Sequence, residues 1–407
     1  MNCCLPYKLR IALASVLLPA TLLVGCMTSA PVSSAEPVPA PSTTRAPTTS
    51  GENGEMSPAA ATSEVGEQTQ QDEQVSAGMG EEELAPIVSA AIDFIGLLDA
   101  QQKEAALLPF DSNKRPNWSN LPAGMLPFDR NGVRIGDLSD NQLAAMLAFL
   151  STTMSPAGLE TVTAIVAAEA VLSESQNAGR LGWSEGNYWL AFFGTPSPTE
   201  PWAWQFGGHH LAVNMSISDG RITMSPAFIG VEPSVIDEAA VDEIFATLGG
   251  DRASAGKGTV APFADEIEAG LALVNGLSAA ARDAALVSRR PNGLLTGAGQ
   301  DGVIPELQGS QASSWGSGQQ QALLDLVSLW VGMLPPRNAR LRMDEIESNL
   351  NDTYFAWHGP TDGAGAIYFR IQGPDLIIEF LTRGPVGANN GHYHSIYRDP
   401  TNEYGQH

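Results

Sequence analysis

Apolar side chains recur every three or four residues through much of this chain, which is the spacing of an α-helix with one buried face. The first such run extends from Leu84 to Leu98 and follows the acidic triplet Glu81-Glu82-Glu83, which suits the positive end of a helix dipole. The same spacing predicts further helices after Ser139, after Ser155-Pro156, and over residues 236–248, 263–277, 279–287, 322–334 and 339–350.

Shorter runs have the composition or alternation of β-strands. Tyr188 to Phe193 is predicted to be a buried strand, and the segment after Pro201 to be a hairpin that turns at Asp219-Gly220 into a strand from Arg221 to Phe228. Four more strands are predicted at residues 354–357, 366–371, 376–381 and 392–397, and a long loop at 291–320. Together these runs indicate an α+β fold, in which a helical N-terminal part and a helical insertion pack around an antiparallel β-sheet.

The first 80 residues show no such periodicity. Lys8 and Arg10 precede an apolar run, and Leu23-Val24-Gly25-Cys26 resembles the lipobox of bacterial lipoproteins, whose cysteine is lipidated after cleavage. We therefore expect a signal peptide at residues 1–25, a disordered acidic tether rich in Pro, Ser and Thr at 26–80, and the α+β domain at 81–407. The expected product is secreted across the membrane and anchored to it by lipid on Cys26. A signal peptide cut elsewhere and an uncleaved anchor are the alternatives.

The cysteine content and the net charge exclude some types of site and disfavour one class of partner. Cys3 and Cys4 would leave with the signal peptide and Cys26 would carry the lipid, so the mature protein would have no free thiol or disulfide. Thiol catalysis and cysteine-bound zinc are then excluded. The net charge of −24 disfavours nucleic acid as a partner, because phosphate binding needs clustered Lys and Arg.

Four of the six histidines form two clusters, Gly208-His209-His210 and Gly391-His392-Tyr393-His394. On an extended segment His392 and His394 point to the same side, and His210 falls on the polar face of the predicted hairpin. These three are the candidate ligands of a mononuclear metal site. His209 begins the apolar face and is predicted to be structural, a support for the ligands or a fourth ligand, and His358 is a further candidate. Zinc or copper suits imidazole ligands in an exported protein better than iron, which remains an alternative.

Several other side chains near the clusters are candidates for substrate contact. The aromatic residues could wall a pocket for a small-molecule or peptide ligand, although ordinary core positions are the alternative for each of them. They are Trp202, Trp204, Tyr393 and Tyr397. Arg398 continues the face of His392 and His394 and is a candidate catalytic residue that clamps a carboxylate or holds an oxyanion, with Asp399 orienting a histidine base. A structural ion pair with Asp399 or Glu403 is the alternative role for Arg398.

Two functions follow from these candidates. The first is a metal-dependent enzyme, hydrolytic or oxidative, that acts on a small or peptidic substrate. The alternative is a metal-free lipoprotein that binds a ligand in a pocket of aromatic, histidine and arginine side chains. No H-E-x-x-H or G-x-S-x-G sequence is present, so zincin protease and α/β-hydrolase activities have no support.

The order of these motifs resembles the DUF3500 family, over residues 84 to the end. The motifs that carry the resemblance are Trp118 with Pro122, the helices within 138–172, Leu190 to Pro196, Pro201 to Gln205, Gly208-His209-His210, His392-x-His394 and Asn402-x-Tyr404-Gly405. The resemblance implies that the Gly-His-His and His-x-His motifs belong to a common site. It implies no reaction, since the family is named for its lack of an assigned function, and it implies no role for His358.

Overall fold

The structure, a computed structural model, describes residues 78–253, 255–287 and 293–405. The predicted signal peptide, Cys26 and nearly all of the predicted tether lie outside these residues. The described part contains one large sheet of mostly antiparallel strands together with many helices, which confirms the predicted α+β fold.

The sheet is built from two meanders of four strands each. The first consists of β3 (Tyr188–Phe193), β4 (Trp202–Gly208), β5 (Leu211–Ser218) and β6 (Arg221–Val231). The second consists of β10 (Tyr354–His358), β11 (Tyr368–Gln372), β12 (Ile377–Thr382) and β13 (Tyr393–Arg398). Strands β6 and β13 pair antiparallel and join the two meanders at the centre of the sheet. Short strands complete its edges: β1 (Leu107–Leu108), β2 (Val133–Arg134) and β9 (Ser310–Gln311).

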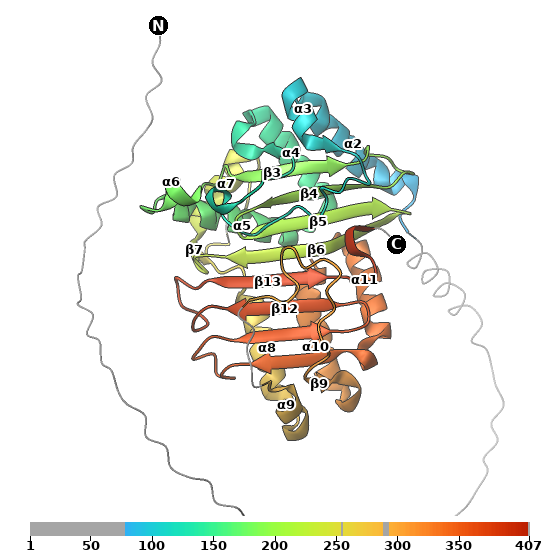
Figure 1. The fold of residues 1–407 in the computed structure, drawn as a ribbon, viewed down its shortest axis with the longest axis vertical. Helices are drawn as coiled ribbons and strands as arrows, with labels where there is room; N and C mark the ends of the chain where they lie inside the picture. The colour runs from blue at the N-terminus through green and yellow to red at the C-terminus, as the bar shows by residue number, and fades with distance from the viewer. Residues whose placement is uncertain (1–77, 254, 288–292, 406–407) are drawn as a thin grey trace, which may run out of the picture. The chain divides into compact units, whose positions relative to one another are not determined.

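Helices cover one face of the sheet (Figure 1). Behind the first meander lie α2 (Glu81–Leu97), α4 (Asp140–Thr153), α5 (Pro156–Ser173) and α7 (Glu238–Thr247), while α3 (Ala100–Ala106) and α6 (Ala178–Leu181) lie at its margins. Behind the second lie α8 (Ala264–Gly276), α10 (Ser317–Val331) and α11 (Pro336–Ser348), while α9 (Ala279–Ala285) lies at its outer edge. The main apolar core fills the space between this helical layer and the sheet. A separate two-stranded sheet pairs β7 (Ile236–Asp237) with β8 (Thr259–Val260).

The other face of the sheet is covered by loops and by the C-terminal turn η5 (Glu403–Gly405) (Figure 1). A smaller apolar cluster lies beneath them and contains Trp118, Ala212, Phe228, Ile396 and Tyr404. The face of β5 that was expected to be polar is therefore buried as well, since Asn214 and Ser216 are only 4% and 2% exposed.

The predicted elements are confirmed with small shifts at their ends. Helix α4 begins where Ser139 forms a capping box with Gln142, and α5 begins where the Ser155 hydroxyl accepts a hydrogen bond from the Gly158 amide. Helix α10 begins at Ser317, five residues before its first predicted residue, and occupies the end of the predicted long loop. Strand β6 extends to Val231 because its last residues pair with the start of β13.

The two halves of the domain repeat one pattern of elements. In each half a short edge strand is followed by a 3₁₀ turn, two long helices and a four-stranded meander. The registers agree too: Val133 pairs with Leu190 and Ser310 with Phe355, while Leu107 and Leu286 run parallel to Phe192 and Trp357. The domain is thus an internal duplication with an approximate twofold axis between β6 and β13.

Candidate metal centre

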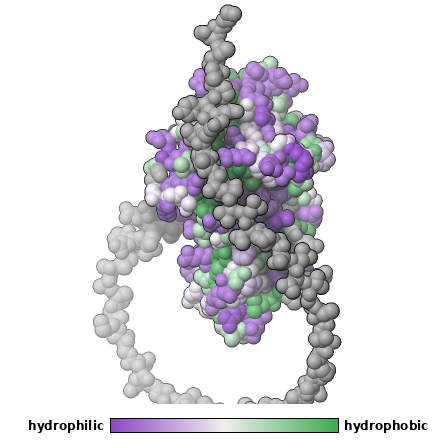
Figure 2. All heavy atoms as spheres, turned by 90° about the vertical axis from the view of Figure 1, so that its left-hand side faces the viewer, coloured by the Kyte–Doolittle hydropathy of each residue, from purple (hydrophilic) through white to green (hydrophobic). Residues whose placement is uncertain are grey.

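Three of the predicted ligands meet at one end of the central strands. His210 lies in the two-residue turn between β4 and β5, because Gly208 pairs with Leu211 across that turn. His392 directly precedes β13, and His394 lies within β13 opposite Gly230 of β6. Since β6 separates β5 from β13, the turn and the start of β13 face each other across the end of β6. Figure 2 views this edge, where hydrophilic and hydrophobic residues are interspersed on the visible surface.

The three imidazoles converge through their Nε2 atoms. His392 Nε2 lies 2.9 Å from His210 Nε2 and 2.8 Å from His394 Nε2. The rings meet edge-on rather than stacked, with interplanar angles of 83° and 76° for these two pairs. A neutral Nε2 carries either one proton or one lone pair, so His392 Nε2 cannot form a good hydrogen bond with both neighbours. The cluster has the geometry of a site that could hold a metal ion.

The backbone at His210 is held in an unusual conformation. Its φ angle of 61° lies in the left-handed region, which costs a residue other than glycine about 1–2 kcal/mol. Two backbone hydrogen bonds fix it there: the amide donates to the Asn120 carbonyl at 3.1 Å, and the carbonyl accepts from the Gly230 amide at 2.7 Å. These two hydrogen bonds maintain the strained conformation, from which the His210 ring reaches His392.

Two buried or half-buried carboxylates support the cluster. Glu169 of α5 accepts a hydrogen bond from His209 Nδ1 at 2.7 Å, and the His209 ring stacks on that of His210 with 3.8 Å between centroids. Glu232 lies 3.3 Å from His392 Nδ1 on the side away from the other imidazoles. A carboxylate on the second nitrogen of a histidine is the usual support for a metal-binding imidazole. His209 is buried as predicted, and it lies beside His210 rather than among the three convergent nitrogens.

The environment keeps the three histidines neutral. Burial lowers the pKa of His210 and of His394 well below the usual value, and the charge of neighbouring histidines lowers both further. Burial, together with the charge of Arg383, lowers the pKa of His392 to about 4. Each ring is therefore neutral at neutral pH and keeps one nitrogen with a free lone pair, which is the protonation state that a metal-binding histidine requires.

A cavity of about 730 Å³ opens beside His394 on the loop-covered face. Its walls are two loops, residues 116–128 and 293–300, with Phe228 and Arg383. The second loop is fixed by Glu379, which is fully buried and accepts hydrogen bonds from the amides of Leu295 and Thr296, each at 2.8 Å. These hydrogen bonds hold one wall of the cavity in place, and the cavity volume lies in the range of sites that bind drug-sized ligands.

Arg398 and Asp399 lie away from the histidines. Arg398 shares a face with His394 as predicted, but four residues along a strand separate them by about 13 Å. The Arg398 side chain is 1% exposed and donates to the Thr296 carbonyl at 2.7 Å, pairs with Asp301 at 3.0 Å and also pairs with Glu403. The structural alternative with Glu403 is thus what the structure contains, and Arg398 holds the 293–300 loop.

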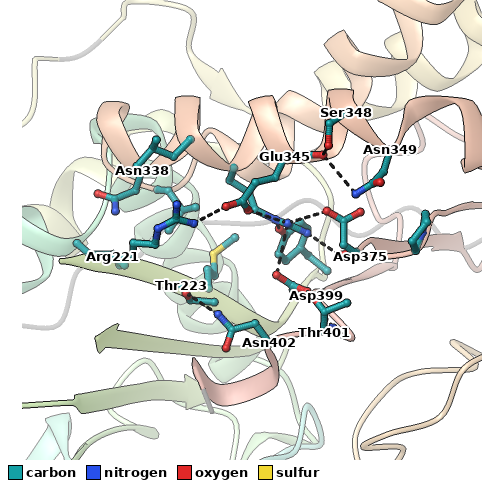
Figure 3. Close-up of a pocket in the computed structure, with 17 residues that line it drawn as sticks. Arg221, Thr223, Asn338, Glu345, Ser348, Asn349, Asp375, Asp399, Thr401 and Asn402 are labelled. Atoms are coloured by element: carbon teal, nitrogen blue, oxygen red, sulfur yellow. Dashed lines mark hydrogen bonds and ion pairs between the residues drawn. The ribbon is translucent and has the colours of Figure 1, made fainter. Parts of the chain in front are cut away.

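Asp399 lines a second cavity, of about 470 Å³, at the opposite end of the central strands (Figure 3). There Arg342 of α11 lies 3.0 Å from Asp375 and 3.4 Å from Asp399. Tyr397 also lines this cavity, where its hydroxyl accepts a hydrogen bond from Arg342 Nε at 2.8 Å. The structure therefore brings neither Asp399 nor Tyr397 to the histidine cluster.

The remaining candidates are core or edge residues. Trp202 and Trp204 pack against Phe149 of the helical layer, and Tyr393 packs against Phe263 and Phe380. None of these three aromatic side chains lines the cavity beside His394. His358 occupies the same register as His394 but three strands away, at about 14 Å, and its Nδ1 lies 3.0 Å from the Val287 carbonyl. The structure does not bring His358 to the other histidines.

Sequence reasoning missed four residues of this site: Glu169, Gly230, Glu232 and Arg383. A signal existed for Glu169, which is the one charged residue in the mainly apolar stretch from Thr161 to Ser173. The positions of the other three depend on which strands are neighbours, and the sequence patterns do not reveal this.

The fold and the site define a class of protein: an α+β domain with a large duplicated sheet and three convergent histidines beside a cavity. The chain belongs to the DUF3500 family, described as "Protein of unknown function (DUF3500)", whose model matches residues 80–406. Comparison with curated proteins and with solved structures gave no significant match.

Proposed function

We propose that this protein is an exported, lipid-anchored metalloprotein in which His210, His392 and His394 hold one divalent transition-metal ion. We further propose that it is a metal-dependent enzyme, whose small or peptidic substrate binds in the cavity beside His394. The observation that carries the proposal is the convergence of three Nε2 atoms, with that of His392 lying 2.9 Å from His210 and 2.8 Å from His394. No arrangement of protons on neutral rings satisfies both of these contacts.

The donor set suits a metal ion with little rearrangement. Zinc binds imidazole nitrogen at about 2.0–2.1 Å, so two nitrogens on a tetrahedral ion are about 3.3 Å apart. The Nε2 atom of His392 would have to move away from each of the other two Nε2 atoms by only a few tenths of an ångström. Three histidines with the fourth position open are typical of catalytic zinc, and copper and iron also accept imidazole ligands. A metal held in this way supplies a Lewis acid and an activated water, or a centre for redox chemistry.

The other half of the duplication supports a functional role for the histidines. By strand register, His210 corresponds to Asp375, His394 to Thr223 and His392 to Arg221. Those three residues line the second cavity, where Arg221 pairs with Glu345 and Asp375 with Arg342 (Figure 3). The equivalent strand ends in the other half thus carry no histidine at these three positions, so the fold itself does not require an imidazole cluster.

The metal proposal is tested by metal analysis of the full-length chain, purified in detergent and equilibrated with zinc or copper. We expect one equivalent per chain that survives gel filtration. Less than a tenth of an equivalent with either metal would exclude the proposed centre and favour the metal-free ligand-binding protein.

Gly230 sets the distance between two of the ligands, and its replacement by alanine should weaken metal binding by about tenfold or more. A Cβ atom there would lie 2.9 Å from the Tyr393 carbonyl, 3.1 Å from His394 Cδ2 and 3.2 Å from His210 Cδ2, so the rings must move apart. Zinc competition titration measures the effect. Gly96→Ala, in helix α2 with no atom within 4 Å of the new methyl group, is the control and should bind zinc as the wild type does. Equal affinities for the two variants would contradict the proposed ligand pair.

The support for export and anchoring is the N-terminal sequence pattern. Cells fed an alkyne-labelled fatty acid should incorporate it into the wild-type protein, which should fractionate with membranes, because the proposed lipid is attached to Cys26. The Cys26→Ala variant should take up no label. Undiminished labelling of that variant would refute lipidation at Cys26.

A further inference from the structure

We infer that the cavity beside the histidine cluster recognises a small carboxylate with an apolar body, and that Arg383 binds the carboxylate. This inference rests on the proposed function, because it names the substrate class of the proposed metal centre. Arg383 was not a candidate from the sequence, and it takes the place that the sequence analysis gave to Arg398.

The charge of the cavity wall favours an anion. Among the lining residues that the structure describes, Arg383 is the one that carries a full charge, and no Asp or Glu is present. The whole chain has 45 acidic and 21 basic residues, so a wall with one cation and no carboxylate is opposite in sign to the rest of the protein. Arg383 is exposed and forms no salt bridge with another described residue, which leaves its guanidinium available for a bidentate carboxylate.

The position of Arg383 connects this anion site to the histidines. Its backbone amide donates to the His392 carbonyl at 3.0 Å, where the pairing of β12 with β13 ends. The positive charge of Arg383 also contributes to the lowered pKa of all three histidines, which agrees with its closeness to them. A ligand held by Arg383 would therefore place atoms beside His394, which lines the same cavity.

The rest of the wall is suited to an apolar group. Trp118, Phe228, Leu294 and Ala298 belong to one apolar cluster and all line the cavity. Three further lining residues keep large apolar side chains exposed to solvent: Leu121, Phe128 and Leu295, at 41%, 39% and 39%. Covering these side chains with an apolar ligand body would be favourable at about 25 cal/mol for each Å² removed from water. One charged group with an apolar wall is the usual composition of a specific small-molecule site.

A comparison with the other half of the domain again indicates that the residue type at this position is not required by the fold. The residue of β5 that corresponds to Arg383 is Ser218, which pairs with Arg221 at the opposite end of the sheet. The chain at the end of β12, where Arg383 lies, therefore does not require arginine for its structure. This contrast makes Arg383 a suitable residue for substitution without loss of the fold.

The test measures the binding of 4-phenylbutyrate and of its primary amide to the full chain by isothermal titration. Each is titrated into metal-free protein and into zinc-loaded protein, because a carboxylate can also bind zinc directly. In the metal-free protein we expect the carboxylate to bind at least tenfold more tightly than the amide, and Arg383→Gln to abolish that preference. Arg340→Gln, an exposed arginine of helix α11 with the same loss of charge, is the matched control and should leave the preference unchanged.

The outcomes for the two proposals can be distinguished. Failure to bind zinc, with the Arg383-dependent preference intact, would overturn the metal centre and leave the anion site. Zinc binding with equal affinities for carboxylate and amide in the metal-free protein would overturn the anion site and leave the metal centre. A preference that Arg340→Gln reduces as much as Arg383→Gln would show a general charge effect and would also overturn the assignment to Arg383.

Discussion

Replacement of His392 by alanine should weaken zinc binding at least about 100-fold, so that the purified chain retains less than a tenth of an equivalent after dialysis. His392 is the central residue of the cluster, with its Nε2 within 2.9 Å of both other imidazoles. Loss of a residue that merely supports a metal ligand costs about 10–100-fold in affinity, and loss of one of three ligands should cost more. Competition with a chromophoric chelator gives the affinity directly.

His358→Ala is the matched control for this experiment. It removes an imidazole from the same register of the sheet, three strands from His394, and should leave one equivalent of zinc bound. If the two variants lost zinc equally, the cluster would not be the binding site. If neither lost zinc, binding would lie elsewhere on this acidic chain.

Arg398→Met should lower the free energy of unfolding by about 3–5 kcal/mol, because it leaves buried partners without their cation. The side chain is 1% exposed, and it bonds to the carbonyls of Thr296 and Gly297 and to the carboxylates of Asp301 and Glu403. Zinc bound per folded chain should stay near one equivalent, since none of these contacts involves a histidine. Denaturant unfolding and metal analysis of the same sample measure both quantities.

Arg340→Met is the control for stability and should change it by no more than about 0.5 kcal/mol, as expected for an exposed side chain. Arg398→Lys serves as a second variant if the methionine form does not fold, and it should lie between the methionine form and the wild type. A folded, fully stable Arg398→Met protein that no longer bound zinc or 4-phenylbutyrate would contradict the structural role and restore Arg398 to the site.

The helices and strands were largely predictable, because each depends on local spacing. The run from Leu84 to Leu98 gave helix α2, and Tyr188 to Phe193 matched β3. The boundary of α10 was less accurate, because the helix begins after Gly316, which has no side chain to signal an N-cap. The Gly316 amide instead donates a hydrogen bond to Gln319 Oε1 at 3.1 Å. The internal duplication was not predicted, since equivalent positions such as His210 and Asp375 differ in residue type while sharing a register.

For the site, strand periodicity predicted which residues share a face of a strand. The period of two placed His394 and Arg398 on one face, and the structure agrees. It carries no information on how far apart two residues of that face lie, nor on which strands are neighbours. The roles of Arg398 and His358 depended on those distances, and the strand order of the duplicated sheet separates both from the cluster. Burial of Trp202 and Trp204 likewise follows from the helical layer behind the sheet rather than from their own segment.

Anomalous diffraction from crystals of the zinc-loaded protein would test the metal centre most directly. We predict one strong zinc peak within about 2.0–2.1 Å of the Nε2 atoms of His210, His392 and His394. Zinc bound only to surface carboxylates, with the three imidazoles still in contact with one another, would contradict the proposed centre.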